Sequence, residues 1–207
     1  YAFLIASSDA LRQWALPDSY ATFGQPLISF GGENPRDMFG PRLLVFATGL
    51  SPADVPYPLP NTITFGGVRL VGSAYGTPDP DQPLIGMVPG ISLPTTGGTL
   101  ALRTFWLVDQ PLAHDYFIFV HIVDATGARV AQRDTPPWQG RFPTSSWQAG
   151  TLVVDACRVV LPALPPGDYR VLVGMFDPAG NPRPPISIGG APWPEHAVEI
   201  ARITVEE

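Results

Sequence analysis

The second part of the chain alternates short apolar runs with turn residues. From residue 68 onward, runs rich in Val, Ile, Leu, Phe and Tyr are separated by turn residues at the spacing typical of a β-sandwich. No comparable helical periodicity follows Pro60, which argues against a parallel α/β architecture. The pattern predicts eight strands, at residues 68–75, 84–93, 99–108, 116–124, 128–134, 151–161, 168–176 and 197–205.

The first 60 residues follow a different pattern, in which Pro, Gly and aromatic residues dominate. Residues 7–16, SSDALRQWAL, have an N-cap serine and spaced apolar positions and predict one short helix that ends at Pro17. RLLVFAT, residues 42–48, predicts a strand, and YAFLIA is either a first strand or the end of a signal or anchor segment. SPADVPYPLPN, residues 51–61, is typical of an extended connector. We therefore expect an N-terminal extension with a proline-rich connector at residues 1–60 and a β-sandwich domain at residues 61–207.

Two local motifs support an antiparallel sandwich. DATGA, residues 124–128, predicts a hairpin turn that Asp124 helps to form, with Gly127 at positive φ. LPPGDYRVLVGMFD, residues 164–177, resembles the tyrosine corner of immunoglobulin-like sandwiches, in which a tyrosine hydroxyl bonds upstream backbone. Tyr169 is then structural. The fold class that we predict is an all-β, antiparallel Greek-key sandwich of the immunoglobulin-like type.

Composition excludes several function classes. The net charge of −6 and the lack of a basic run argue against nucleic acid as a partner. A single cysteine, Cys157, excludes an internal disulfide and a thiol cluster, and its apolar surroundings favour burial. No apolar window approaches the length of a membrane span. No cofactor is expected.

Three segments resemble a known module: FGGVRLVGSAY, YFIFVHIVDATGARVAQRDTPPWQGRFPTSSWQAG and LPALPPGDYRVLVGMFDPAGNPR. They are similar to the soluble C-terminal β-sandwich module of bacterial multi-pass membrane glycosyltransferase-like proteins of the dolichyl-phosphate-mannose mannosyltransferase type, and of related surface proteins. The likeness covers residues 62–205, about two thirds of the chain, and residues 1–60 resemble nothing known. It rests on Phe119, His121, Asp124, Gly127, Val130, Gln132, Asp134, Pro143, Thr144, Trp147, Gly150, Asp155, Gly167, Tyr169, Gly174 and Asp177. The resemblance implies an extracytoplasmic location and a non-catalytic accessory role.

The stretch RDTPPWQGRFPTSSWQAG, residues 133–150, is the candidate ligand-binding segment. It holds two tryptophans, two arginines and an aspartate, and such rings and guanidinium groups suit sugar or protein contacts. The alternative is that the segment closes one end of the sandwich, with Thr144 and Ser145 capping a single helical turn. We favour this closure for Trp147, whereas Trp138 and Arg141 stay open to a ligand. The candidate ligand-binding residues are Trp138, Arg141, Asp134 and Trp147.

Catalytic and metal sites are disfavoured. A carboxylate pair would have to come from Asp115, Asp124, Asp134 and Asp155, and we expect Asp155 to pair with Arg158 or Arg133. His121 alternates with apolar residues, so we expect it in or beside the core rather than in a triad with Ser145 or Ser146. His114, Asp115 and His121 make a weak metal set, and the loop with Asp79 and Asp81 is expected to be a solvated turn.

The sequence thus predicts a non-catalytic, extracytoplasmic binding or scaffolding module of a bacterial envelope or membrane protein, tethered through a segment in front of Tyr1. Its partner is a membrane or envelope protein, or a carbohydrate. The alternatives are a structural subunit of a larger membrane or surface assembly, and, least favoured, a carbohydrate-active enzyme.

Overall fold

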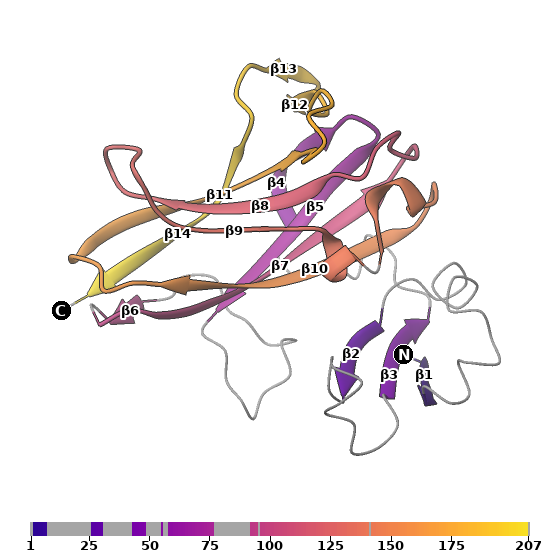
Figure 1. Ribbon diagram of the computed structural model, residues 1–207, viewed down its shortest axis with the longest axis horizontal. Helices are drawn as coiled ribbons and strands as arrows, with labels where there is room; N and C mark the ends of the chain where they lie inside the picture. Colours follow the sequence, from indigo (N-terminus) through magenta and orange to yellow (C-terminus); the bar gives the residue numbers. More distant parts are fainter. Residues whose placement is uncertain are drawn as a thin grey trace.

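The structure is a computed structural model that describes residues 2–7, 26–30, 43–48, 55, 58–76, 92–94, 96–140 and 142–206. Nearly all of its regular structure is β (Figure 1). The strands are β1 (Ala2–Ser7), β2 (Pro26–Phe30), β3 (Leu43–Thr48), β4 (Pro58–Phe65), β5 (Val68–Gly76), β6 (Ser92–Pro94), β7 (Gly98–Val108), β8 (Phe117–Val123), β9 (Arg129–Thr135), β10 (Leu152–Leu161), β11 (Gly167–Phe176), β12 (Ile186–Ile188), β13 (Ala191–Trp193) and β14 (Val198–Glu206). Between β9 and β10 lie two single turns of 3-10 helix, η3 (Pro137–Gly140) and η4 (Thr144–Ser146). No helix in these ranges is long and apolar enough to cross a membrane.

Two sheets form the sandwich. A six-stranded sheet has the order β10-β7-β5-β4-β12-β13, and a five-stranded sheet has the order β6-β14-β11-β8-β9. The chain changes sheet repeatedly, among other places between β7 and β8, between β9 and β10 and between β10 and β11, which gives the crossing connections of a Greek-key fold. Neighbouring strands are antiparallel except β6, which pairs with β14 in parallel. A separate three-stranded antiparallel sheet has the order β1-β3-β2.

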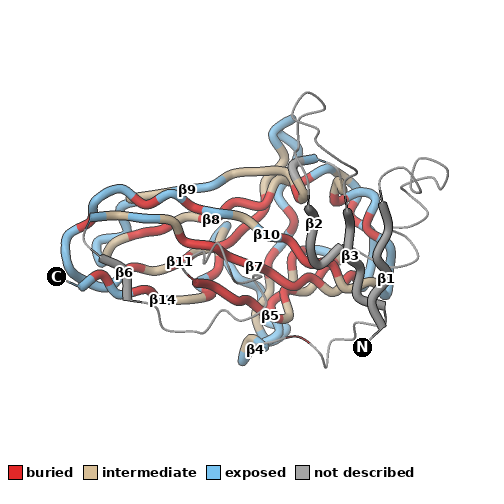
Figure 2. The backbone as a smooth tube through the Cα atoms, turned by 90° about the horizontal axis from the view of Figure 1, so that it is seen from below, coloured by how far each residue is buried: buried red, intermediate tan, exposed pale blue. Residues whose placement is uncertain are grey.

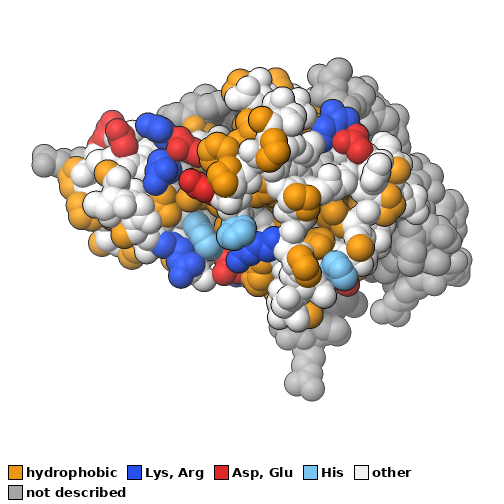
Figure 3. All heavy atoms as spheres, turned by 90° about the horizontal axis from the view of Figure 1, so that it is seen from above, with side chains coloured by type: hydrophobic (Ala, Val, Ile, Leu, Met, Phe, Trp, Pro, Cys, Tyr) orange, Lys and Arg blue, Asp and Glu red, His pale blue; other side chains and the backbone are white. Residues whose placement is uncertain are grey.

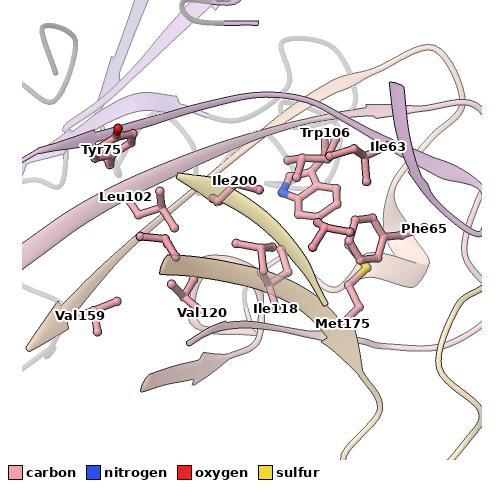
Figure 4. Packing of buried hydrophobic residues seen from close by; sticks show 14 of the residues in the cluster. Ile63, Phe65, Tyr75, Leu102, Trp106, Ile118, Val120, Val159, Met175 and Ile200 are labelled. Atoms are coloured by element: carbon pink, nitrogen blue, oxygen red, sulfur yellow. The ribbon is translucent and has the colours of Figure 1, made fainter. Parts of the chain in front are cut away.

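The core lies between the two sheets and consists of alternate residues of their strands. Figure 2 shows the buried stretches along β5 and β7, in the middle of the six-stranded sheet. The largest fully buried side chains include Trp106, Trp147, Phe65 and Leu70. Trp106 meets Phe65 edge-on with ring centroids 5.3 Å apart, and its Nε1 donates to Thr104 Oγ1 at 2.8 Å. Figure 4 shows the Trp106 and Phe65 rings side by side, with aliphatic side chains of both sheets packed around and beyond them.

The predicted sandwich strands are confirmed, most of them closely. Those at 68–75, 99–108, 116–124, 128–134, 151–161, 168–176 and 197–205 are present with bounds within one residue of the predicted ones. Gly127 has a φ of 86°, and Asp124 Oδ1 accepts hydrogen bonds from Thr126 and Ala128 N–H, so the hairpin turn is confirmed too. Of the strand predicted at 84–93, only the part from Ser92 lies within the described residues, where it belongs to β6.

The proline-rich N-terminal part differs from the prediction where it is described. Residues 58–61, predicted as a connector, belong to β4, in which Pro58 pairs with Gly72 before the register shifts ahead of Ile63. Prolines lack an N–H and are tolerated in strands where the register is irregular. YAFLIA forms β1 from Ala2 onward, and RLLVFAT forms β3 from Leu43 onward. The helix predicted at residues 7–16 lies outside the described residues apart from Ser7, which ends β1, and the domain boundary after residue 60 stays a prediction.

The tyrosine corner is present. Tyr169 is buried on β11, and its hydroxyl donates a hydrogen bond to the carbonyl oxygen of Pro165 at 2.9 Å. This bond ties the turn before β11 to the strand, so a structural role for Tyr169 is confirmed.

Replacing Tyr169 by Phe keeps the buried ring and removes only this hydrogen bond. We expect the free energy of unfolding to fall by about 1 kcal/mol, measured by urea denaturation. Tyr116 offers the matched control, because its hydroxyl donates to Pro182 O over a longer distance of 3.2 Å. Tyr116→Phe should therefore cost less than Tyr169→Phe, and equal stability of Tyr169→Phe and the wild type would contradict a stabilising corner.

Candidate functional site

The structure separates the candidate ligand-binding residues of the 133–150 segment. Arg141 lies outside the described residues. Trp147 is 1% exposed within the core, where its ring lies 6.4 Å from Trp106, centroid to centroid. Trp147 has no exposed face for a ligand, and its ring instead helps to close the core, as favoured from the sequence. Thr144 is buried as well: its hydroxyl donates to His114 O at 2.8 Å and accepts from Tyr116 N–H at 2.7 Å, instead of capping η4.

Trp138 lies at the junction of the two sheets. It is half-buried, its backbone has the left-handed φ of 51°, and its Nε1 donates to Val154 O on β10 at 2.7 Å. Its backbone N–H donates to Asp155 Oδ1 at 3.2 Å. These bonds attach η3 to β10, the edge strand of the six-stranded sheet.

Asp155 does not form the expected ion pair. Its carboxylate is buried and accepts the Trp138 N–H, and no arginine pairs with it in the described part of the chain. Burial raises its pKa to about 6, while the hydrogen bonds from the N–H groups of Trp138 and Ala156 oppose the rise. The pKa of the neighbouring Cys157 thiol is raised to about 12, first by burial and then by the Asp155 charge, so this thiol stays protonated.

The face of the five-stranded sheet that turns away from the core carries a polar and aromatic cluster. On β8, Ile118, Val120 and Ile122 belong to the core, so Phe117, Phe119 and His121 lie on the opposite face. His121 is half-buried against the Phe119 ring, so it lies beside the core on its outer side and not within it. Both faces of β8 are largely apolar in sequence, and alternation alone does not tell which of them is inside.

Gly174 leaves room for the Phe119 ring on this outer face. Gly174 of β11 lies opposite Phe119, and a Cβ at this position would be 2.2 Å from Phe119 Cζ and 2.4 Å from the carbonyl oxygen of His196. The Phe119 ring therefore lies across the space that a side chain on β11 would fill, and Phe119 is only 4% exposed although it is on the outer face.

Two charged or titratable groups pack on this ring. The His121 imidazole lies beside Phe119 with centroids 4.5 Å apart. The guanidinium carbon of Arg183, from the loop between β11 and β12, is 5.5 Å from the Phe119 centroid and 5.8 Å from that of Phe176. Such contacts are favourable cation–π interactions and hold the guanidinium over the sheet.

Strand β9 and the hairpin before it add further polar groups. Asp134 pairs with Phe119 and Gln132 with His121 in the antiparallel register, which places both on this face. Gln132 Nε2 donates to Asp134 Oδ2 at 3.0 Å, and Arg129 Nη1 lies 3.5 Å from His121 Nε2. We call Phe119, His121, Arg129, Gln132, Asp134 and Arg183 the His121 cluster. Figure 3 shows histidine and arginine side chains gathered beside acidic ones on this face.

Hydrogen bonding within the cluster is incomplete. Asp134 Oδ1 is buried and has no hydrogen-bond donor among the described residues, although His121 Nε2 lies 3.4 Å away. The contact from Arg129 needs an unprotonated Nε2, which cannot also donate to Asp134. Burial lowers the pKa of His121, and the charges of Arg129 and Arg183 lower it further, while Asp134 opposes the shift. A neutral imidazole is therefore the form that this geometry favours.

The residues considered for catalysis are dispersed. Asp124 is engaged in the hairpin turn, Asp115 accepts from Ser145 N–H, and Asp155 is buried beside Trp138 on the other sheet. Within the described ranges, no three or more His, Cys, Asp or Glu side chains are grouped to hold a metal ion. Of the residues considered for catalysis or metal binding, His121 and Asp134 come together in the His121 cluster, and Asp134 is also the one described candidate ligand-binding residue that belongs to it. Arg129 and Arg183 were not predicted, because no motif marks them.

Comparison with known proteins gives distant likenesses only. No family model and no curated protein matches the chain. Among solved structures, the C-terminal domain of Wzt is similar over 75% of this chain and 83% of that chain, with 13% identity and a TM-score of 0.42. A β-glucuronidase from glycoside hydrolase family 2 (13% identity, TM-score 0.36) is matched over 46% of this chain and 10% of its own. A putative β-galactosidase from Bacteroides fragilis (11%, 0.32) is matched over 72% and 18%. These likenesses are too distant to carry a function across.

Proposed function

We propose that the protein is a non-catalytic module that binds carbohydrate at the His121 cluster, on the outer face of the five-stranded sheet. The observation that carries this proposal is the combination of groups on that face: a guanidinium and an imidazole packed on a phenyl ring, beside a carboxylate and a primary amide. Planar polar groups of this kind bind pairs of sugar hydroxyls. The half-buried rings of Phe117 and Phe176 on the same face offer apolar surface to the face of a sugar ring.

Three features favour a binding role over a purely structural one. The cluster lies on the side of β8 opposite the core cluster of Ile118, Val120 and Ile122. Arg183, Arg129 and Gln132 are exposed to solvent. Asp134 Oδ1 has no donor among the described residues, and an unsatisfied buried acceptor is uncommon outside functional sites. The exposed Arg129, Gln132 and Arg183 are therefore available to a ligand.

The extracytoplasmic location and the bacterial envelope partner also belong to this proposal. They are supported by the resemblance of residues 62–205 to envelope-associated sandwich modules. In this setting the ligand is a glycan of the cell surface, and the module holds it without chemical change.

Binding to a glycan array, followed by calorimetric titration of the best glycan, tests the proposal. We expect Arg183→Ala and Gln132→Ala each to weaken binding about tenfold, since each removes hydrogen bonds to the ligand and neither side chain supports the core. The matched control is Arg158→Ala, an exposed arginine on β10 of the other sheet.

Trp138→Ala separates this site from the segment that the sequence favoured. If the His121 cluster is the site, Trp138→Ala leaves the affinity unchanged. Loss of binding in Trp138→Ala, with Arg183→Ala and Gln132→Ala unaffected, would place the ligand at the 133–150 segment instead and refute the proposal.

A further inference from the structure

Arg129 and Arg183 bring two guanidinium groups to the His121 cluster without a carboxylate partner. Both are exposed, and neither is in an ion pair in the part of the chain that the structure describes. Among the other described arginines of the sandwich, Arg69 pairs with Asp109, and Arg170 and Arg202 pair with Glu199. The exposed Arg133 and Arg158 have no ion pair in the described part of the chain, but they do not belong to the cluster. Positive charge on the cluster is thus not neutralised by the protein.

Asp134, the carboxylate of the His121 cluster, contacts Gln132 and His121 and is not paired with either arginine. Its Oδ2 accepts from Gln132, and its Oδ1 is buried facing His121 Nε2. With a neutral His121, the cluster holds two cations and one anion, on a chain whose net charge is −6. A local excess of positive charge on an acidic protein attracts an anionic ligand.

We infer that the saccharide bound at the His121 cluster is acidic, and that Arg129 and Arg183 together bind its anionic group, a carboxylate or a phosphate. This inference rests on the proposed function and specifies its ligand class. Guanidinium groups donate two parallel N–H bonds to either anion, which is the strongest polar contact available to this surface. The cation–π contacts of Arg183 hold its guanidinium in place before the ligand arrives, so less conformational entropy is lost on binding.

Anion binding also changes the hydrogen bonds of His121. In the free protein, Arg129 Nη1 faces His121 Nε2 at 3.5 Å. When Arg129 turns to the anion, Nε2 is free to take up a proton and to donate it to Asp134 Oδ1, which lies 3.4 Å away and lacks a donor. The bound anion further favours the imidazolium form. Binding is therefore coupled to proton uptake, and the affinity rises as the pH falls from 7 toward 5.5.

The other neighbours of His121 do not oppose this coupling. On β9, Gln132 is uncharged and Asp134 favours the proton. On β11, the residue opposite His121 is the apolar Leu172, and beyond it on β14 the carboxylate of Glu199 is held by Arg202 and Arg170. Arg129 and Arg183 are the cations that oppose protonation, and the ligand neutralises them.

The test uses the purified 207-residue chain and pairs of glycans that differ only in charge. Uronate-containing and sialylated oligosaccharides are compared with their carboxyl-reduced forms, and phosphorylated glycans with their dephosphorylated forms. We expect binding to one acidic series at least tenfold tighter than to its neutral counterpart, and the preferred series distinguishes carboxylate from phosphate. Arg129→Ala and Arg183→Ala should each remove most of this preference, with Arg158→Ala as the control.

Proton uptake is measured by titration in buffers of different ionisation enthalpy between pH 5.5 and 8. His121→Gln should bind the acidic glycan more weakly than the wild type at pH 5.5, and it should lose both the proton uptake and the pH dependence. Equal binding of acidic and neutral partners would overturn the inference and leave the carbohydrate-binding function intact. Binding of no glycan from either series would overturn the proposed function itself.

Discussion

Replacing Trp147 by Ala is expected to lower the free energy of unfolding by about 3 to 5 kcal/mol. The indole is 1% exposed and belongs to the main core cluster. It packs near Trp106 at 6.4 Å and on Phe142 at 6.3 Å, centroid to centroid, and its Nε1 donates to Phe142 O at 3.2 Å. Truncation would leave a large cavity and a carbonyl oxygen without this donor. Urea denaturation followed by far-UV circular dichroism measures the loss.

Trp193 provides the control for this substitution, because it is the same residue type in an exposed position. It is 38% exposed on β13, with its Nε1 donating to Ala197 O at 3.0 Å. Trp193→Ala should therefore cost about 1 kcal/mol or less. A similar loss of unfolding free energy for both variants would mean that Trp147 does not close the core. Trp147 would then again be a candidate ligand-binding residue.

The strands could be predicted from the sequence because their apolar runs have sharp ends. Gly127 and the residues around it stop β8 and start β9, and the turn before Gly167 starts β11, so the bounds are fixed by local chemistry. The short β12 and β13 could not be predicted in this way. They lie among prolines and glycines, and β12 becomes a strand by pairing with β4, more than a hundred residues earlier in the chain.

The candidate site was less predictable than the fold. FIFVHIV is apolar on both faces, so the sequence does not tell whether His121 or Ile122 faces the core. The arrangement of Phe119 depends on Gly174, and the position of Arg183 depends on a loop that follows β11; neither is close to β8 in the chain. Asp134 was singled out for its aromatic neighbours in sequence, and it faces a different set of side chains in the fold.

The same limit explains the error at Asp155. A carboxylate within an apolar strand suggests an arginine partner, since burial of a lone charge is unfavourable. The fold supplies instead the backbone N–H of Trp138, from a turn of 3-10 helix in which Trp138 itself has a left-handed φ of 51°. The Asp155 carboxyl group is therefore buried with two neutral backbone donors, Trp138 N–H and Ala156 N–H, and no cation, and this arrangement has a measurable consequence.

Asp155→Asn is expected to stabilise the protein above pH 6 and to have little effect near pH 4. Burial raises the pKa of Asp155 from 3.8 to about 6, so the folded state favours the protonated carboxyl. The stability that this group contributes is fully present below its unfolded pKa of 3.8 and is lost as the pH rises through about 6. Above that pH the cost of the buried charge amounts to about 3 kcal/mol. Asparagine keeps an oxygen that accepts from Trp138 N–H and carries no charge.

The measurement is urea denaturation of both proteins at intervals from pH 4 to pH 8. Other groups titrate equally in the two proteins, so the difference between their free energies of unfolding isolates Asp155. This difference should grow through pH 4 to 6 in favour of Asp155→Asn and then level off. A variant that is less stable than the wild type at pH 8 would mean that the charged carboxylate is itself stabilised in the fold. A binding partner for that charge would then have to come from residues outside those that the structure describes.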